Sequence, residues 1–579
     1  MTKIERQSLA HYAGRYRTSV AIVVVASIFM NLMVFAGTLY MMLVYDSVLP
    51  SGSLATLAGL FAMLLVLYAF QAVFESIRGD ALLTIANGVH DELFRSVHYA
   101  TTSTPLKGPV KSSDGLQLVR DLDQIHSFLA GPGPVALIDL PWVIVFLIVL
   151  SALHWALGLT ALVGTLVLVL LAVHTSKQTA KGLHAMGNVV GARSAATLDE
   201  LRFVESAAAM GMRDRLLARA GGFEHHFIDA QSFLSRVGTR LGSTGKVLRM
   251  LLQSGMLTVG ALLVIDGQAS GGVILASSVL SGRALAPVDM AIGNWRNMST
   301  ARTGWTRLME AIDVFRPPHP RSVQLDPPNK ELRVRDLWLV PPGTERSVLN
   351  GISLDLIPGQ AVAIIGPSAA GKTTLARALV GIWPPSRGEI RIDGATYDQW
   401  DPDQLGASFG YVPQSVDILE GTIGQNIARF DPQATSESIV EAAKAAGMHQ
   451  TILAMPQGYD SRVTSSGMEL SAGQRQRIGL ARALYGNPFL IVLDEANSNL
   501  DGEGDAALAT AVEAVKARGG VVVMITHRPA TLGPMTHIAV LNQGKIVEFG
   551  TRDDVMKKLG AAPALANPPG PPQNKAESA

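Results

Sequence analysis

The sequence predicts a helical membrane domain followed by a soluble α/β domain with a phosphate-binding loop. The 579-residue chain is 16% charged and has a mean hydropathy of +0.27, which is too apolar for an ordinary soluble protein. Long apolar stretches occupy the first 292 residues. From about residue 332, β-branched runs alternate with helical patterns, as expected for an α/β core.

Six apolar stretches are long enough, or nearly so, to cross the hydrocarbon core as helices of about 20 residues. They cover residues 19–44, 54–74, 134–152, 156–174, 247–265 and 271–292. The short connections 45–53, 153–155 and 266–270 contain no Lys or Arg, whereas the two long connections contain many. The positive-inside rule therefore predicts a multi-pass protein whose long connections and both termini are cytoplasmic.

The long connections have the composition of helices. Residues 81–100 and 194–233 show helical periodicity and few helix breakers. Helices lying on the membrane surface are one explanation. We favour membrane helices that continue into the cytoplasm, because each connection must return to a neighbouring span.

Three ionisable residues fall inside the predicted spans, where they are rare and usually functional or paired. They are Asp139, Arg283 and Asp289. They either line a substrate path or form an Asp–Arg pair that holds two helices together, and the sequence does not decide between these alternatives. Pro141 and Pro287 are expected to kink their helices.

Composition divides the chain into four parts and excludes several kinds of site. We predict a membrane domain at 1–315, a proline-rich linker at 316–331, a soluble domain at 332–559 and a disordered tail at 560–579. The absence of cysteine excludes disulfides, zinc thiolate sites and cysteine nucleophiles. A net charge of +1 argues against nucleic acid as the main partner.

The phosphate-binding loop lies between the apolar run 361–365 and a helical pattern at 375–380. Strand, glycine-rich loop and helix in this order are the context that makes a P-loop motif credible. We expect its backbone N–H groups to surround phosphate oxygens, with Lys372 at the β- and γ-phosphates and the Thr373 hydroxyl on Mg²⁺. The loop residues are Gly366, Pro367, Ser368, Ala369, Ala370, Gly371, Lys372, Thr373 and Thr374.

Other residues complete a hydrolytic site. The apolar run 489–493 ends in Asp494, a candidate Mg²⁺ contact, and Glu495, which could polarise the attacking water. Gln414 supplies an amide for the metal or the water, and His527 follows a second apolar run where it can contact the γ-phosphate. The stretch from Leu470 begins a helix with a serine cap, which makes another anion-binding terminus.

With these motifs in this order, the chain resembles the ATP-binding cassette (ABC) transporters. The resemblance implies a six-span, exporter-type α-helical transmembrane domain fused to an α/β P-loop ATP-binding cassette domain. It implies that a homodimer binds ATP between the phosphate loop of one copy and the signature and D-loop of the other. The signature residues are Ser471, Ala472, Gly473 and Gln474, and the D-loop residue is Asp501.

Two positions depart from the usual ABC pattern. Ala472 stands where the signature more often has a second glycine, and it is small enough to allow the same backbone approach. Val340 replaces the aromatic residue that usually stacks on adenine. Trp338 would share its face of a strand, so we expect Trp338, or apolar contact with Val340, to take that role.

Membrane motifs narrow the resemblance to the type I secretion permease/ATPases, in the subgroup that exports proteases, lipases and S-layer proteins. They are Ile-Asp-Leu-Pro-Trp at 138–142, Ser-Gly-Arg-Ala-Leu-Ala-Pro at 281–287 and Ile-Gly-Asn-Trp-Arg at 292–296, with Asn-Ser-Asn-Leu-Asp at 497–501. The resemblance implies a bacterial inner-membrane protein surrounded by lipid. It further implies a periplasmic adaptor, an outer-membrane channel and an unfolded polypeptide substrate with a C-terminal signal.

Two alternatives remain at this point. An exporter of lipids or small molecules would have the same fold and the same ATPase motifs. A nucleotide-gated channel or regulator without turnover is disfavoured, because Glu495 and His527 are both present.

Overall fold

A computed structural model describes residues 14–103, 116–315, 325–464 and 470–561. The first two ranges form a compact helical unit, and the last two form a compact α/β unit. Residues 316–324 of the predicted linker and 562–579 of the predicted tail lie outside the described residues.

The helical unit is a bundle of long helices interrupted by short ones. A π-helical turn, η1, separates the first long helix from α3. The elements are α2 (Arg17–Leu43), η1 (Val44–Val48), α3 (Leu49–Ser51), α4 (Leu54–Ser103), α5 (Gln117–Ala130), α6 (Pro132–Asp139), α7 (Trp142–Leu153), α8 (Trp155–Arg202), α9 (Val204–Ala209), α10 (Arg213–Ile265) and α11 (Gly271–Val314).

Five helices of the described chain are long and apolar enough to cross a membrane, and a sixth span results if α6 and α7 count as one. The α6–α7 pair bends by 42° beside Pro141, which confirms the predicted kink there. Pro287 lies inside helix α11, and its kink stays a prediction. Each predicted span coincides with one of these helices or with the bent pair.

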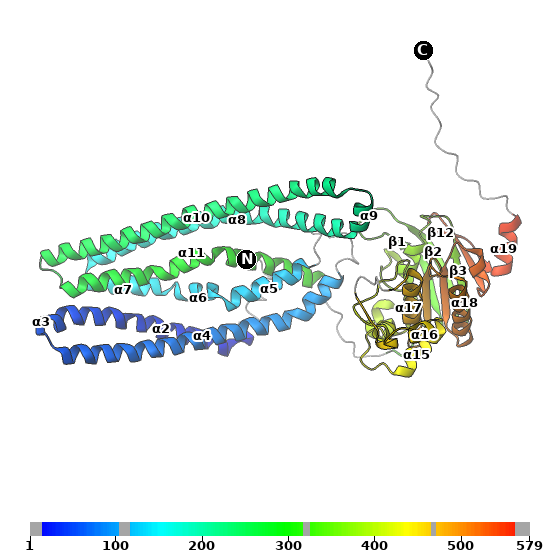
Figure 1. Ribbon diagram of the computed structural model, residues 1–579, viewed down its shortest axis with the longest axis horizontal. Helices are drawn as coiled ribbons and strands as arrows, with labels where there is room; N and C mark the ends of the chain where they lie inside the picture. Colours follow the sequence, from blue (N-terminus) through cyan, green and yellow to red (C-terminus); the bar gives the residue numbers. More distant parts are fainter. Residues whose placement is uncertain (1–13, 104–115, 316–324, 465–469, 562–579) are drawn as a thin grey trace, which may run out of the picture. The chain divides into compact units, whose positions relative to one another are not determined.

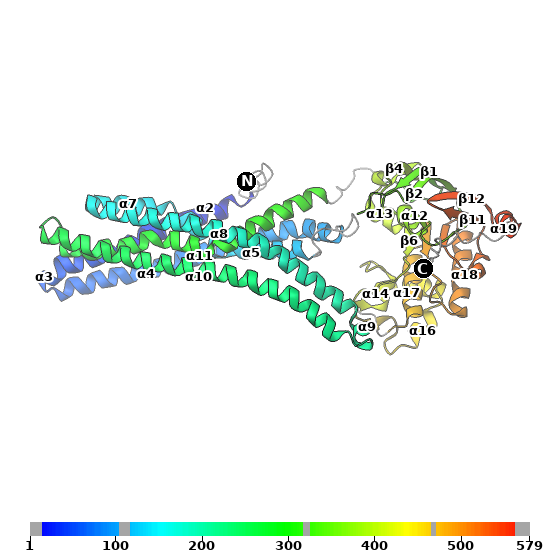
Figure 2. The same ribbon diagram turned by 90° about the horizontal axis from the view of Figure 1, so that it is seen from above.

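Four helices run far past the length of a span. Helix α4 has 50 residues and is about 75 Å long at about 1.5 Å per residue. Helices α8, α10 and α11 have 48, 53 and 44 residues, and α9 joins the distant ends of α8 and α10 (Figures 1 and 2). The predicted continuation of the membrane helices is therefore confirmed, with a break between α8 and α10 in the expected helical stretch 194–233.

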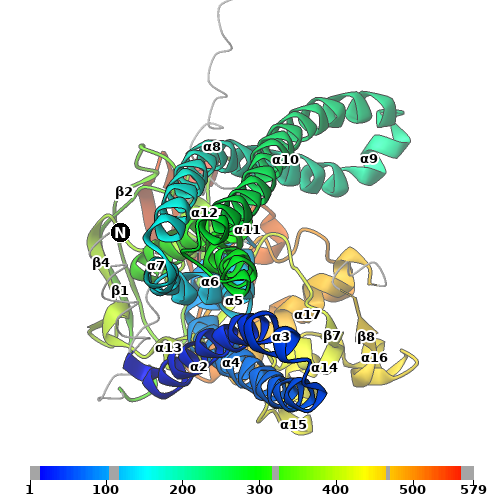
Figure 3. The ribbon, with the colours of Figure 1, turned by 90° about the vertical axis from the view of Figure 1, so that its left-hand side faces the viewer.

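Helix α11 lies between two helix pairs, α2 with α4 and α8 with α10 (Figure 3). Its packed side includes Leu280, which joins Phe146 and Leu150 of α7 and Met256 of α10 in one buried cluster. Small side chains on α11, among them Ala276 and Ala284, are also buried and let the neighbouring helices approach closely.

Asp139 forms a largely buried ion pair, whose side chains are 9% and 14% exposed. Its carboxylate accepts a hydrogen bond from Arg78 of α4 (3.2 Å) and another from Asn31 of α2 (3.0 Å). Arg78 also donates to Ser27 of α2 (3.3 Å). The Asp–Arg pair is thus formed with Arg78, while Arg283 is exposed on α11. The pair and its two hydrogen bonds to Asn31 and Ser27 together join three helices next to the break at Pro141.

The described part of the α/β unit contains three sheets. Its strands are β1 (Leu332–Leu339), β2 (Leu349–Leu356), β3 (Ala361–Ile365), β4 (Arg387–Ile392), β5 (Ala395–Thr396), β6 (Phe409–Val412), β7 (Gly421–Thr422), β8 (Arg462–Val463), β9 (Leu490–Asp494), β10 (Val521–Ile525), β11 (His537–Asn542) and β12 (Lys545–Thr551). Its helices are α12 (Lys372–Leu379), η3 (Tyr397–Gln399), α13 (Pro402–Ala407), α14 (Ile423–Ile427), α15 (Ser436–Ala445), α16 (His449–Leu453), η4 (Gly458–Asp460), α17 (Ala472–Leu484), α18 (Gly502–Ala517), η5 (Pro529–Leu532) and α19 (Arg552–Ala561).

The central sheet has the strand order β12-β11-β3-β10-β9-β6, and all of its pairs except β11–β12 are parallel. Strands β9 and β10 are buried along their whole length, so they are apolar throughout rather than alternating. Strands β3, β6, β9 and β10 end at the same edge of the sheet because they are parallel. The loops that follow them must therefore meet.

We predict that the Arg78–Asp139 pair matters for stability because its side chains are only 9% and 14% exposed. Arg78→Leu should destabilise the helical unit by about 3–5 kcal/mol, since Asp139 would remain buried without its partner. Arg78→Leu combined with Asp139→Leu should recover much of that loss. Thermal unfolding in detergent would measure both.

The Arg249–Asp289 pair is a matched control, because its side chains are 46% and 30% exposed. Arg249→Leu should cost about 0–1 kcal/mol, as exposed pairs do. Equal losses of thermal stability in Arg78→Leu and Arg249→Leu would contradict the prediction.

Candidate active site

The loop after β3 is shaped by two glycines. Gly366 has φ +155°, and a Cβ there would lie 2.0 Å from the Leu541 carbonyl oxygen. Gly371 has φ +100°, and a Cβ there would lie 2.9 Å from a methyl group of Leu349. Only glycine fits both positions, because each combines a positive φ with a close neighbour.

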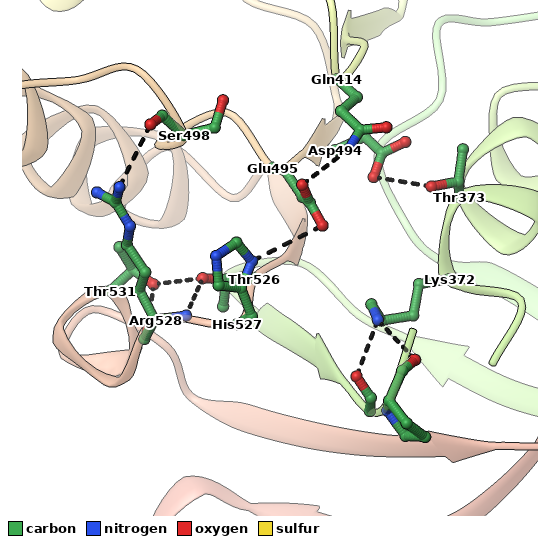
Figure 4. A network of polar contacts seen from close by, with 12 residues as sticks. Lys372, Thr373, Gln414, Asp494, Glu495, Ser498, Thr526, His527, Arg528 and Thr531 are labelled. Carbon is green, nitrogen blue, oxygen red and sulfur yellow. Dashed lines mark hydrogen bonds and ion pairs between the residues drawn. The ribbon is translucent and has the colours of Figure 1, made fainter. Parts of the chain in front are cut away.

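Helix α12 begins at Lys372, directly after this loop. The Lys372 ammonium donates to the carbonyl oxygens of Gly366 (2.8 Å) and Pro367 (2.9 Å), so its charge lies over the loop (Figure 4). Ser368, Ala369 and Ala370 complete the loop, and Thr373 and Thr374 follow in the first turn of α12. Positive charge and a helix N-terminus thus coincide where an anion would bind.

Asp494 is the last residue of β9 and is 1% exposed. The Thr373 hydroxyl donates to Oδ1 of Asp494 (3.3 Å), whereas the buried Oδ2 has no partner in the described part of the chain. Burial raises the pKa of Asp494; the Thr373 hydrogen bond opposes this shift and the neighbouring Glu495 adds to it. A buried carboxylate oxygen without a donor, beside a hydroxyl, fits a hard divalent cation.

Glu495 lies between side chains from two other loops (Figure 4). Gln414, in the loop after β6, donates from Nε2 to Glu495 Oε2 (3.0 Å). His527, after β10, places Nδ1 3.7 Å from Glu495 Oε1. The structure thus brings together Gln414 and Glu495, which are 81 positions apart in the sequence. These contacts hold the Glu495 carboxylate where it could take a proton from water.

The signature residues lie at the start of α17. Ser471 and Gln474 form a capping box, in which Ser471 Oγ accepts from the Gln474 N–H (3.2 Å) and Gln474 Oε1 accepts from the Ser471 N–H (2.9 Å). Ala472 is exposed, and a Cβ on Gly473 would lie 2.9 Å from the Asn499 carbonyl oxygen. Among the described residues, no hydrogen bond joins these signature residues to the phosphate loop of the same chain.

Trp338 lies near the end of β1 and Val340 directly follows that strand; buried Leu337 and Leu339 alternate with them. They therefore point away from the buried side, on one face, as the period of a strand requires. The Trp338 indole donates to Asp336 Oδ1 (2.9 Å), which fixes the orientation of the ring.

Sequence reasoning missed two residues that contact the site. Gln476 of α17 donates from Nε2 to the Glu495 carbonyl oxygen (3.1 Å). Arg528, next to His527, donates to the Ser498 carbonyl oxygen (3.3 Å) (Figure 4). The sequence contained one indication for Gln476: it lies on the apolar face of a helical pattern, and a glutamine there needs polar partners.

The chain matches two family models. Residues 349–498 match the model described as "ABC transporter", and residues 20–288 match "ABC transporter transmembrane region". The chain is also similar to a solved "bacterial Atm1-family ABC exporter with ATP bound", with a TM-score of 0.80 over 95% of this chain and 99% of that one. The sequence identity is 22%, so this likeness concerns the fold.

Two curated relatives are also similar over nearly the whole of this chain. The chain is 46% identical, over 535 residues and 92% of both chains, to "Type I secretion system ATP-binding protein PrsD" of Rhizobium meliloti (strain 1021). It is 28% identical to "Leukotoxin translocation ATP-binding protein LktB" of Mannheimia haemolytica, over 94% of this chain and 77% of that protein.

We predict that Asp501 stabilises the cassette through helix α18. Its Oδ1 accepts a hydrogen bond from the Gly504 N–H (2.8 Å) at the N-terminus of that helix. Asp501→Ala should lower the free energy of unfolding by about 1 kcal/mol, whereas Asp501→Asn should keep the cap. Denaturant unfolding of the purified protein would measure both, and equal losses in the two variants would contradict the assignment.

Proposed function

Because the chain belongs to the ABC transporter family, and within it to the type I secretion ATP-binding proteins, we propose that it exports an unfolded polypeptide at the expense of ATP. The 46% identity to PrsD across nearly the whole of both chains carries this proposal. The grouping of Lys372, Glu495 and His527 supports turnover rather than gating alone.

Nucleotide binding follows from the chemistry of the loop after β3. Its backbone N–H groups and the start of α12 would surround the phosphates, and Lys372 would leave its two carbonyl acceptors to contact the β- and γ-phosphates. We propose that Trp338, or apolar contact with Val340, holds the adenine.

Thr373, Asp494 and Gln414 would hold Mg²⁺, since Asp494 keeps one oxygen without a donor and Thr373 lies beside it. Mg²⁺ in that place supplies charge neutralisation to the transferring phosphoryl group. Glu495 then accepts a proton from the attacking water, Gln414 orients the water, and His527 contacts the γ-phosphate.

A second copy of the chain completes the site in this proposal. Ser471, Ala472, Gly473 and Gln474 form a capped helix N-terminus, and among the described residues no hydrogen bond joins them to the phosphate loop of the same chain. This supports a role at the nucleotide of the other copy. Asp501, in the D-loop, is held beside the same helix, because its Oδ2 lies 3.6 Å from a guanidinium nitrogen of Arg477. A homodimer would thus contain two ATP sites.

Several further assignments belong to the same proposal. The protein is a multi-pass membrane protein, and we place it in the bacterial inner membrane with both termini cytoplasmic, because the long connections hold the Lys and Arg residues. We propose a periplasmic adaptor and an outer-membrane channel as partners. The domain limits 1–315, 316–331, 332–559 and 560–579 remain part of the proposal.

We predict that Glu495→Gln will abolish export. Losing the general base should lower ATP turnover by about 10²–10⁴-fold while ATP binding persists. The experiment compares proteins released into the medium by cells with equal amounts of wild type or variant. One or a few large proteins should vanish from the medium and accumulate inside the cells.

Glu503→Gln is the matched control, because it makes the same chemical change at an exposed position in α18. It should leave secretion unchanged. If Glu495→Gln leaves the secreted proteins unchanged while lipid or drug content shifts, the exporter acts on lipids or small molecules and the polypeptide proposal fails.

Lys372→Ala should act at an earlier step than Glu495→Gln. Removing a charged hydrogen-bond donor worth about 1.5–3 kcal/mol should weaken ATP binding by about 10- to 100-fold. Titration of the purified protein with ATP would measure this. An unchanged affinity in Lys372→Ala, or an equally large loss in Glu495→Gln, would contradict the assigned roles.

A further inference from the structure

The backbone of Glu495 has a conformation that few side chains adopt. Its φ is +53°, in the left-handed region that disfavours residues with a Cβ. Such conformations cluster at active sites and persist only where the surrounding structure holds them. The residue with this conformation is also the one that we propose as general base.

Three hydrogen bonds hold the Glu495 peptide groups. Its N–H donates to the Ile525 carbonyl of β10 (3.1 Å), and its carbonyl accepts from the Ser498 N–H (3.0 Å). The third hydrogen bond comes from the Gln476 side chain of α17, which is the second donor to the same carbonyl (3.1 Å). The first two bonds belong to the backbone, so Gln476 is the side chain in this group that a substitution can remove.

The amide of Gln476 uses both of its polar atoms. It is 3% exposed, and Nε2 donates to the Ser498 hydroxyl (3.3 Å) as well as to Glu495. Its Oε1 accepts from the Asn499 N–H (3.0 Å). The opposite amide orientation would set oxygen against the Glu495 carbonyl and NH₂ against the Asn499 N–H, so the partners fix the orientation.

We propose that Gln476 is a positioning residue for the general base, which it holds against the signature helix of its own chain. The signature residues form the start of helix α17, and its cap, Ser471, lies five positions before Gln476. This inference rests on the proposed function, in which that helix serves the nucleotide of one site while Glu495 of the same chain serves the other. Gln476 thus links the position of the base at one site to the helix that contacts the second ATP.

A role in hydrolysis can be separated from a merely structural role. If Gln476 positions Glu495, its loss lowers kcat and leaves ATP binding unchanged, because the phosphate loop is untouched. If Gln476 only stabilises the helix, its loss lowers thermal stability and weakens closure of the two copies on ATP. The two roles therefore predict different measurements on one variant.

The first test is Gln476→Met in the purified full-length protein, since Met keeps the unbranched shape and removes all three hydrogen bonds. We expect kcat for ATP to fall at least about tenfold with KM nearly unchanged, since misplacing a reacting group by about 1 Å can cost about 100-fold. Gln450→Met, an exposed position on α16, is the matched control and should keep the wild-type kcat. A wild-type kcat in Gln476→Met would overturn the inference.

The second test measures ATP retention without turnover. Glu495→Gln should retain bound ATP through gel filtration, and adding Gln476→Met should leave the amount of retained ATP unchanged. A loss of retained ATP in the double variant would mean that Gln476 supports docking of the signature helix, which would also overturn the inference.

Two controls keep these tests decisive. If Gln476→Met fails to fold, Gln476→Asn keeps an amide but withdraws it by one methylene, and the same fall in kcat is expected. If wild type itself does not hydrolyse ATP, the proposed function fails. If wild type hydrolyses ATP and both Gln476 variants keep its kcat, only the inference about Gln476 fails.

Discussion

The parallel pairing of β3, β6, β9 and β10 is the constraint on which the cassette depends. Ile525 of β10 pairs with Ile364 of β3 and with Asp494 of β9, so these strands end level with one another. Parallel strands place their following loops at one edge of the sheet. The pairing of the strands therefore brings together the phosphate loop, the two carboxylates, Gln414 and His527. Contacts between the loops are not needed for this.

The pairing of the strands does not by itself direct the Glu495 carboxylate into the site, and the backbone of Glu495 supplies the turn that does. A strand ending at Asp494 directs the chain away from the sheet, and a turn at the next residue is needed to return the carboxylate to Gln414 and His527. The left-handed φ of +53° makes that turn, and hydrogen bonds with β10, α17 and Ser498 of the same loop maintain it. Strain at the base is thus offset by the core of the cassette, which includes the buried helix α17.

The helical unit meets a different constraint, because charged groups in a span must be paired or hydrated. Arg78, Asp139, Asn31 and Ser27 satisfy one another across α2, α4 and α6. Their cluster adjoins the break at Pro141, where the span loses the regular helical bonding that hydrocarbon surroundings demand. The polar contacts hold the three helices together at the place where the backbone of the span is weakest.

The sequence by itself determined the positions of the spans, their continuation into long helices and the order of the cassette motifs, because apolar run length and local turn chemistry are properties of neighbouring residues. Tertiary structure decided which partner Asp139 takes, since Arg78 is 61 positions away and helical periodicity does not say which faces meet. It also decided the contact of Gln476 with the base, across 19 positions and two elements. Both outcomes depend on how helices and strands pack, and packing is set by the whole core rather than by any one stretch of the chain.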